Sequence, residues 1–82
     1  MDEETLKEYW NIYTECWKLF KRNCNPVDTV DFWENLVKEC HELRKRFPSE
    51  FARHQIVLTY TEIERLQREK LEKELALAKA KG

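Results

Sequence analysis

The residues of this chain that could bind a metal ion are three cysteines and two histidines: Cys16, Cys24, Cys40, His41 and His54. Structural zinc sites usually take their ligands in close pairs, such as two cysteines separated by two residues, because a tight turn then presets half of the tetrahedron. Here the candidate ligands are widely dispersed. We therefore expect no metal and no other cofactor, with Cys16 and Cys40 serving as small, weakly polar core residues.

The same cysteines are poor candidates for covalent catalysis. A catalytic thiolate needs a base and an oxyanion hole, commonly near a helix N-terminus or a loop with free amide groups. Cys16 and Cys40 fall in the middle of predicted helices. Cys24 falls at a C-terminal end, where the helix dipole disfavours a thiolate.

Paired carboxylates give a second possible chemistry, because Glu-x-x-Glu motifs on facing helices can hold magnesium. Glu39 and Glu42 have this spacing, and so do Glu69 and Glu72. At about 100° per residue, however, Glu39 and Glu42 point away from the apolar face of their helix, toward water. These observations together predict that the protein is not an enzyme.

Composition indicates one small helical domain. The chain has 82 residues, of which 38% are charged, and it contains one glycine and two prolines, too few for the turns of a sheet. The formal net charge of −1 gives no long-range attraction for nucleic acid or anionic lipid. No apolar run reaches the roughly 18 residues of a membrane span. An acidic N-terminus unlike a secretory signal, and an odd number of cysteines, favour a cytoplasmic protein with reduced thiols.

The first predicted helix covers about residues 3–23 and ends before Pro26. Its apolar side chains recur in steps of three and four, with Ile12 and Leu19 on the flank. The central face comprises Leu6, Tyr9, Trp10, Tyr13, Cys16, Trp17, Phe20 and Cys24.

Two further helices are predicted over about residues 29–46 and from residue 50 onward, separated by Pro48. The second has its own apolar face, which includes Trp33 and Cys40, and the third has a stripe that ends near Leu66. Trp17, Trp33 and Cys40 are each central to an apolar face. We therefore expect these three side chains to form the middle of the core.

Short connections predict antiparallel neighbours, and hence an all-α, up-down-up three-helix bundle over residues 1–67. A charged helical extension over residues 68–82 would overhang this bundle. Leu71 and Leu75 lie about 80° or more from the line of the core stripe. The extension is therefore either a solvated helix that frays or a separate contact surface.

Ten aromatic residues are more than one seam of so short a bundle can easily enclose. Surplus apolar side chains at the surface would mark a protein interface, where tryptophan and tyrosine are favoured anchors. Alternatively, each wide face packs against two neighbours and the tyrosine hydroxyls reach water. The candidate interface residues are Tyr9, Trp10, Ile12, Leu19, Phe51 and Leu58, with Leu71 and Leu75 on the extension.

A basic patch around residues 44–54 offers a competing function. Arg44, Lys45, Arg46 and Arg53 flank the second turn and could contact phosphates of a nucleic acid. The alternative is that they compensate a helix C-terminus and keep the protein soluble.

The segments LKEYWNIYTECWKLFKRN, DFWENLVKECHEL and EFARHQIVLTYTEIERL resemble small helical proteins of prophages and conjugative elements in Gram-positive bacteria. This resemblance covers roughly residues 5–67, implies a bacterial cytoplasm and transfers no site residue. The sequence thus predicts a non-enzymatic protein-interaction or structural module that binds a protein partner or forms a homodimer. A nucleic-acid-associated accessory protein is the alternative.

Overall fold

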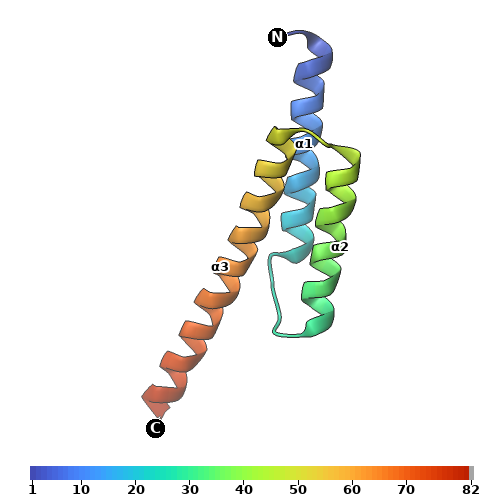
Figure 1. The fold of residues 1–82 in the computed structure, drawn as a ribbon. Helices are drawn as coiled ribbons and strands as arrows, with labels where there is room; N and C mark the ends of the chain where they lie inside the picture. The colour runs from blue at the N-terminus through green and yellow to red at the C-terminus, as the bar shows by residue number, and fades with distance from the viewer. Residues whose placement is uncertain (82) are drawn as a thin grey trace.

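The computed structural model describes residues 1–81 and contains three helices, α1 (Glu3–Asn23), α2 (Val30–Arg46) and α3 (Glu50–Lys81). Within this range no strand is present. Helices α1 and α3 run in the same direction, α2 runs in the opposite direction, and α3 continues well beyond the other two (Figure 1). The predicted all-α, up-down-up bundle with a long overhanging third helix is confirmed. None of the helices in the described range is long and apolar enough to cross a membrane.

Short polar side chains begin all three helices. The Asp2 carboxylate accepts a hydrogen bond from the Thr5 amide at 2.8 Å. The Thr29 and Ser49 hydroxyls accept from the amides of Phe32 and Ala52, at 3.2 and 3.1 Å. Each of these caps satisfies an amide that has no partner inside its helix, so the sequence fixes where the helices start.

The core lies where the three helices meet. One large side chain from each helix is completely enclosed, namely Leu19, Leu36 and Ile63. The small side chains of Cys16, Cys40 and Ala52 and three larger aliphatic ones lie around them. The buried cluster consists of Ile12, Cys16, Leu19, Leu36, Cys40, Leu43, Ala52, Ile56 and Ile63.

The predicted rotation of the first helix is wrong. Ile12 and Leu19, placed on the flank by the sequence pattern, are 2% and 0% exposed, whereas Trp17, placed at the core centre, is 58% exposed. The physical reason is size, because an indole between three closely packed helices would force them apart, while isoleucine, leucine and cysteine fit. Trp33 is half-buried at the edge of the core, and Cys40 is buried as predicted.

Polar contacts hold the lower end of α1 against α2. The buried Asn23 amide nitrogen donates to the Leu19 carbonyl at 2.9 Å and to the Glu39 carboxylate at 2.8 Å. Arg22 Nε donates to the other Glu39 oxygen at 3.3 Å. Glu39 therefore bridges two helices, which corrects the expectation that it faces only water.

The bundle contacts of α3 extend past the end of its apolar stripe. Gln67 is buried, and Lys70 Nζ donates to the Pro26 carbonyl in the first connection at 3.2 Å. Beyond Lys70, α3 still borders the first connection, because Lys73, Glu74 and Leu77 line a groove together with Cys24, Asn25 and Pro26.

Candidate functional site

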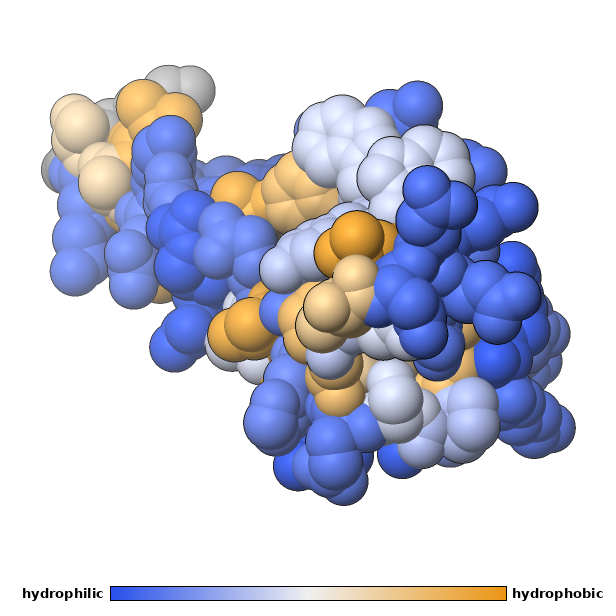
Figure 2. Space-filling model, turned by 90° about the horizontal axis from the view of Figure 1, so that it is seen from above, coloured by the Kyte–Doolittle hydropathy of each residue, from blue (hydrophilic) through white to orange (hydrophobic). Residues whose placement is uncertain are grey.

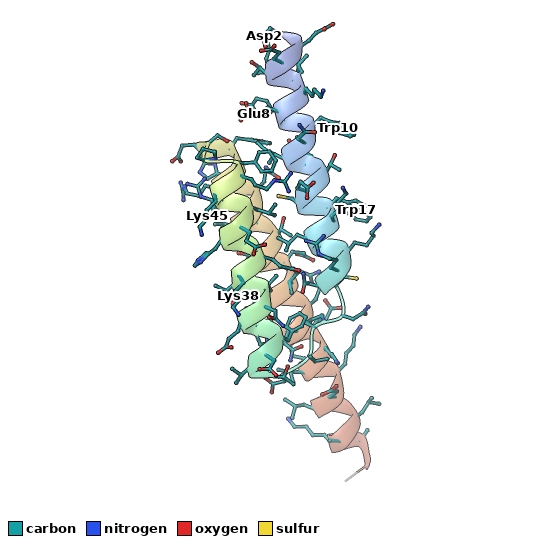
Figure 3. All side chains as sticks on the ribbon, turned by 90° about the vertical axis from the view of Figure 1, so that its right-hand side faces the viewer. Asp2, Glu8, Trp10, Trp17, Lys38 and Lys45 are labelled. Carbon is teal, nitrogen blue, oxygen red and sulfur yellow. The ribbon has the colours of Figure 1, made fainter. Side chains whose placement is uncertain are left out.

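An apolar stripe runs along the outside of α1. Leu6, Trp10, Tyr13 and Trp17 follow steps of four, three and four residues, and they are 54%, 64%, 54% and 58% exposed. Trp10 and Trp17 project from the same side of the helix, away from α2 (Figure 3). Because Ile12, Cys16 and Leu19 fill the opposite face, α1 has two apolar faces and only one of them is used by the fold.

Helix α3 supplies the other side of this surface. A groove between α1 and α3 is lined by Tyr13, Trp17 and Phe20 on one side and by Leu58 and neighbouring residues on the other. Leu58 is 61% exposed. We define the aromatic face as Leu6, Trp10, Tyr13, Trp17 and Leu58.

Aromatic contacts hold these rings in place. Trp17 stacks on Phe20 with ring centroids 6.1 Å apart and an interplanar angle of 26°. Phe51 of α3 lies edge-on to Tyr13 at 5.1 Å and tilted against Tyr9 at 4.4 Å. The exposed rings of Tyr13 and Trp17 are therefore anchored by half-buried ones, so a ligand would meet a largely preformed surface at these two positions.

The exposed area is large for so small a protein. A tryptophan or tyrosine side chain can bury about 150–250 Å², and three such rings are more than half exposed, together with Leu6 and Leu58. This amounts to several hundred Å², in the range of apolar patches that mark binding sites on monomeric proteins. In Figure 2, pale and orange side chains reach the surface between blue, hydrophilic ones.

The two borders of the aromatic face differ in charge. At about 100° per residue, Lys7, Lys18 and Lys21 lie on the open side of α1, next to the stripe, together with the single carboxylate of Glu3, and all four residues are exposed. Lys18 makes one 3.7 Å contact with Glu15. We call these three lysines the lysine edge. On the α3 border, Glu62 is paired with Arg65, whose guanidinium also contacts Glu69 at 2.8 Å, so this border is close to neutral.

The predicted interface residues fall into four groups. Trp10 and Leu58 lie on the aromatic face, and Tyr9 and Phe51 are half-buried beside it. Leu71 and Leu75 lie on the overhang, where they are 39% and 62% exposed.

Ile12 and Leu19 do not reach the surface, so including them in the interface was wrong. Sequence reasoning also missed Leu6, Tyr13 and Trp17, which it assigned to the core. The signal that could have identified them is a second stripe of small and aliphatic residues on the same helix, Ile12, Cys16 and Leu19.

The predicted basic patch is largely engaged in local contacts. Arg44 Nη1 donates to the carbonyls of Phe47 and Ser49, at 3.3 and 2.9 Å, and so braces the turn between α2 and α3. Arg46 lies 3.6 Å from Glu15 and over the Phe47 ring.

Of the other patch members, Arg53 contacts Glu50 at 2.9 Å and Lys45 is exposed on α2. Three of the four cations in the patch therefore already contact carboxylates or backbone carbonyls, which leaves less of their charge available for phosphates.

Burial disfavours the reactive thiolate form of the two core cysteines, Cys16 and Cys40. Burial raises the pKa of Cys40 to about 11 and, opposed by a hydrogen bond with Thr59, also raises the pKa of Cys16. Both are therefore protonated at neutral pH, while a thiolate is the form that attacks or binds metal. Among residues 1–81, no three His, Cys, Asp or Glu side chains are grouped so that they could hold a metal ion.

A second groove, of mixed polar and apolar character, lies between α2 and α3. It is lined by Trp33, Tyr60, Glu64, Gln67 and Arg68, with Trp33 edge-on to Tyr60 at 6.2 Å. Gln67 Oε1 is buried, and no hydrogen-bond partner for it occurs in the described part of the chain.

Comparison with known protein families, curated proteins and solved structures gives no match for this chain.

Proposed function

We propose that this protein is a non-enzymatic interaction module whose aromatic face binds a protein partner. The observation that carries the proposal is the exposure of Trp10, Tyr13 and Trp17 on one stripe of α1. Tryptophan and tyrosine are the residues most enriched among binding hot spots, since they bury a large area at a low cost in side-chain entropy.

The contacts of Tyr13 with Phe51 and of Trp17 with Phe20 leave more than half of each exposed ring unused by the fold. The core is complete without them, because Leu19, Leu36 and Ile63 and their neighbours enclose it. Keeping several hundred Å² of apolar surface in water is unfavourable and promotes aggregation, which is a disadvantage unless a partner covers it. A binding role explains why the surface is there.

The test compares a double variant, Trp10→Ser with Trp17→Ser, against a control variant, Leu77→Ser, which removes an exposed leucine from the overhang. Circular dichroism should report the same helix content for both. Chemical cross-linking followed by affinity capture from the host should recover the same protein with wild type and control, and lose it with the double variant. Capture that is indifferent to both tryptophans would contradict the proposal.

A gel-shift series against salt separates this proposal from nucleic-acid binding. Binding driven by phosphate contacts weakens steeply as salt rises, by a factor set by the number of phosphates neutralised. We expect no salt-sensitive shift. Loss of such a shift on Arg53→Gln with Lys45→Gln would favour the nucleic-acid alternative.

A further inference from the structure

The shape of the aromatic face suits one kind of ligand. It follows α1 from Leu6 to Trp17, a length of roughly 17 Å at 1.5 Å per residue, and from Tyr13 onward it is bounded on one side by α3. The two helices run in the same direction and diverge toward the C-terminal end of α3 (Figure 1), with the groove between them. A third helix laid along such a groove packs ridges into grooves on both of its neighbours.

The backbone of this surface is not available for recognition. Residues on α1 and α3 already use their amides and carbonyls inside the helices, so a bound strand would find no edge to pair with. Recognition must therefore run through side chains, as when an amphipathic helix places its apolar residues in a groove. The walls, Trp17 and Leu58, and the half-buried Phe20 are apolar contacts of that kind.

Charge identifies one edge of the ligand. Lys7, Lys18 and Lys21 border the face on the open side of α1, and the α3 border is neutralised by the Glu62–Arg65 pair. Resting on the proposed function, we propose that the aromatic face binds an amphipathic α-helix of another protein that carries aspartate or glutamate along one side of its apolar stripe. The acidic side of that helix lies against the lysine edge, and its other side lies against α3.

A second copy of this chain fits the face less well. When two identical helices pack antiparallel about a two-fold axis, the same edge of each helix lies beside its counterpart. The lysine edge of one α1 would then face the lysine edge of the other. Like charges placed together across an interface are unfavourable and act against the wrong partner.

The test uses a displayed library of 18-residue amphipathic helices with a fixed leucine stripe and randomised positions on both edges of that stripe. Selection on the wild-type protein should enrich acidic residues on one edge. The same library is then selected on Lys7→Glu/Lys18→Glu/Lys21→Glu, where the acidic preference should disappear. The matched control is Lys38→Glu/Lys45→Glu, which alters exposed lysines on α2 (Figure 3) and should leave the preference unchanged.

An enriched peptide then gives the affinity. By fluorescence anisotropy, we expect its Kd to rise about tenfold in the lysine-edge variant, as three exposed ion pairs would give, and to stay within about twofold in the α2 control. Trp10→Ser with Trp17→Ser should abolish binding.

Three outcomes would overturn this inference, and they separate it from the proposed function. One outcome is that the selected helices need Trp10 and Trp17 for binding yet show no acidic preference on either edge. This outcome would leave the interaction role intact and would contradict the proposal that the ligand carries an acidic edge. A dimer by sedimentation that dissociates in the tryptophan double variant would make a second copy the occupant. Failure to enrich any tryptophan-dependent helix, with a monomeric protein, would rule out a helical ligand, and the proposed function would fall only if affinity capture were also indifferent to the tryptophans.

Discussion

The indole of Trp17 stacks on the ring of Phe20 at 6.1 Å, yet Trp17 remains 58% exposed. Phe20 packs against the buried cluster while Trp17 faces solvent, so this pair connects the core to the exposed aromatic face. Trp17 rests on the core and is not part of it, and its removal should have a different energetic effect from removal of a true core side chain.

We predict that Trp17→Ala lowers the free energy of unfolding by about 1 kcal/mol, because only the area buried against Phe20 and its neighbours is lost. Leu36→Ala should instead cost about 2–5 kcal/mol, since Leu36 is 0% exposed and leaves a cavity. Urea denaturation of both variants measures the difference. Equal losses at the two positions would mean that the indole is buried and that the rotation of α1 is wrong.

The sequence predicted the number and order of the helices and the turns between them, because prolines are local signals. The caps at Asp2, Thr29 and Ser49 likewise act within three residues of their targets and need no distant contacts. The rotation of α1 could not be predicted in the same way. This helix has two apolar stripes, and the choice between them depends on how α2 and α3 pack against it, which is a property of all three helices together.

The candidate surface was predicted only in part for the same reason. A surplus of aromatic residues indicated that some apolar side chains must reach the surface, and Trp10 and Leu58 do. Which others accompany them follows from the rotation of α1. Once Ile12 and Leu19 are assigned to the core, the exposure of Leu6, Tyr13 and Trp17 follows from helical geometry alone.

A second prediction concerns the buried amide at the end of α1. Asn23→Ala removes the hydrogen bond to Glu39 and the one to the Leu19 carbonyl, so we expect a loss of about 1–2 kcal/mol in the free energy of unfolding. The matched control is Asn35→Ala, an exposed asparagine on α2, which should change it by less than about 0.5 kcal/mol. Thermal or urea unfolding of the two variants checks the contrast. Similar small effects would show that the bridge between α1 and α2 contributes little.

A third prediction follows from the buried thiol of Cys40. Desolvation raises the pKa of Cys40 in the folded protein from 9.0 to about 11, so the unfolded chain loses this proton first as the pH rises. The protonated Cys40 thiol therefore makes its full contribution to the free energy of unfolding below about pH 9, and this contribution is lost as the pH rises from 9 to 11. The free energy of unfolding of wild type should fall more steeply over this range than that of Cys40→Ala. The variant controls for tyrosine and lysine groups, which titrate in the same range in both proteins. Parallel curves would contradict the prediction.

The last prediction separates the bundle from the overhang of α3. Because Gln67 is buried and Lys70 donates to the Pro26 carbonyl, the bundle needs α3 through about residue 70. Beyond it, Leu71 and Leu75 are exposed, and the ion pairs of Glu69 with Arg65 and Lys73 stabilise the helix locally by a few tenths of a kcal/mol each. Deleting residues 75–82 should therefore leave the melting temperature within about 2 °C of wild type, whereas deleting residues 68–82 should lower it by several degrees through loss of the Lys70 contact.

Sedimentation of the same two truncated proteins tests whether the overhang has a binding role. If Leu75 takes part in self-association, the 75–82 deletion will have a lower oligomeric state than wild type while its melting temperature is retained. An unchanged oligomeric state, together with an unchanged affinity for a helix bound at the aromatic face, would assign the overhang no part in either contact. Unfolding of the shorter deletion would instead place residues 75–82 in the folding unit, in conflict with the exposure of Leu75 and Leu77, each 62%.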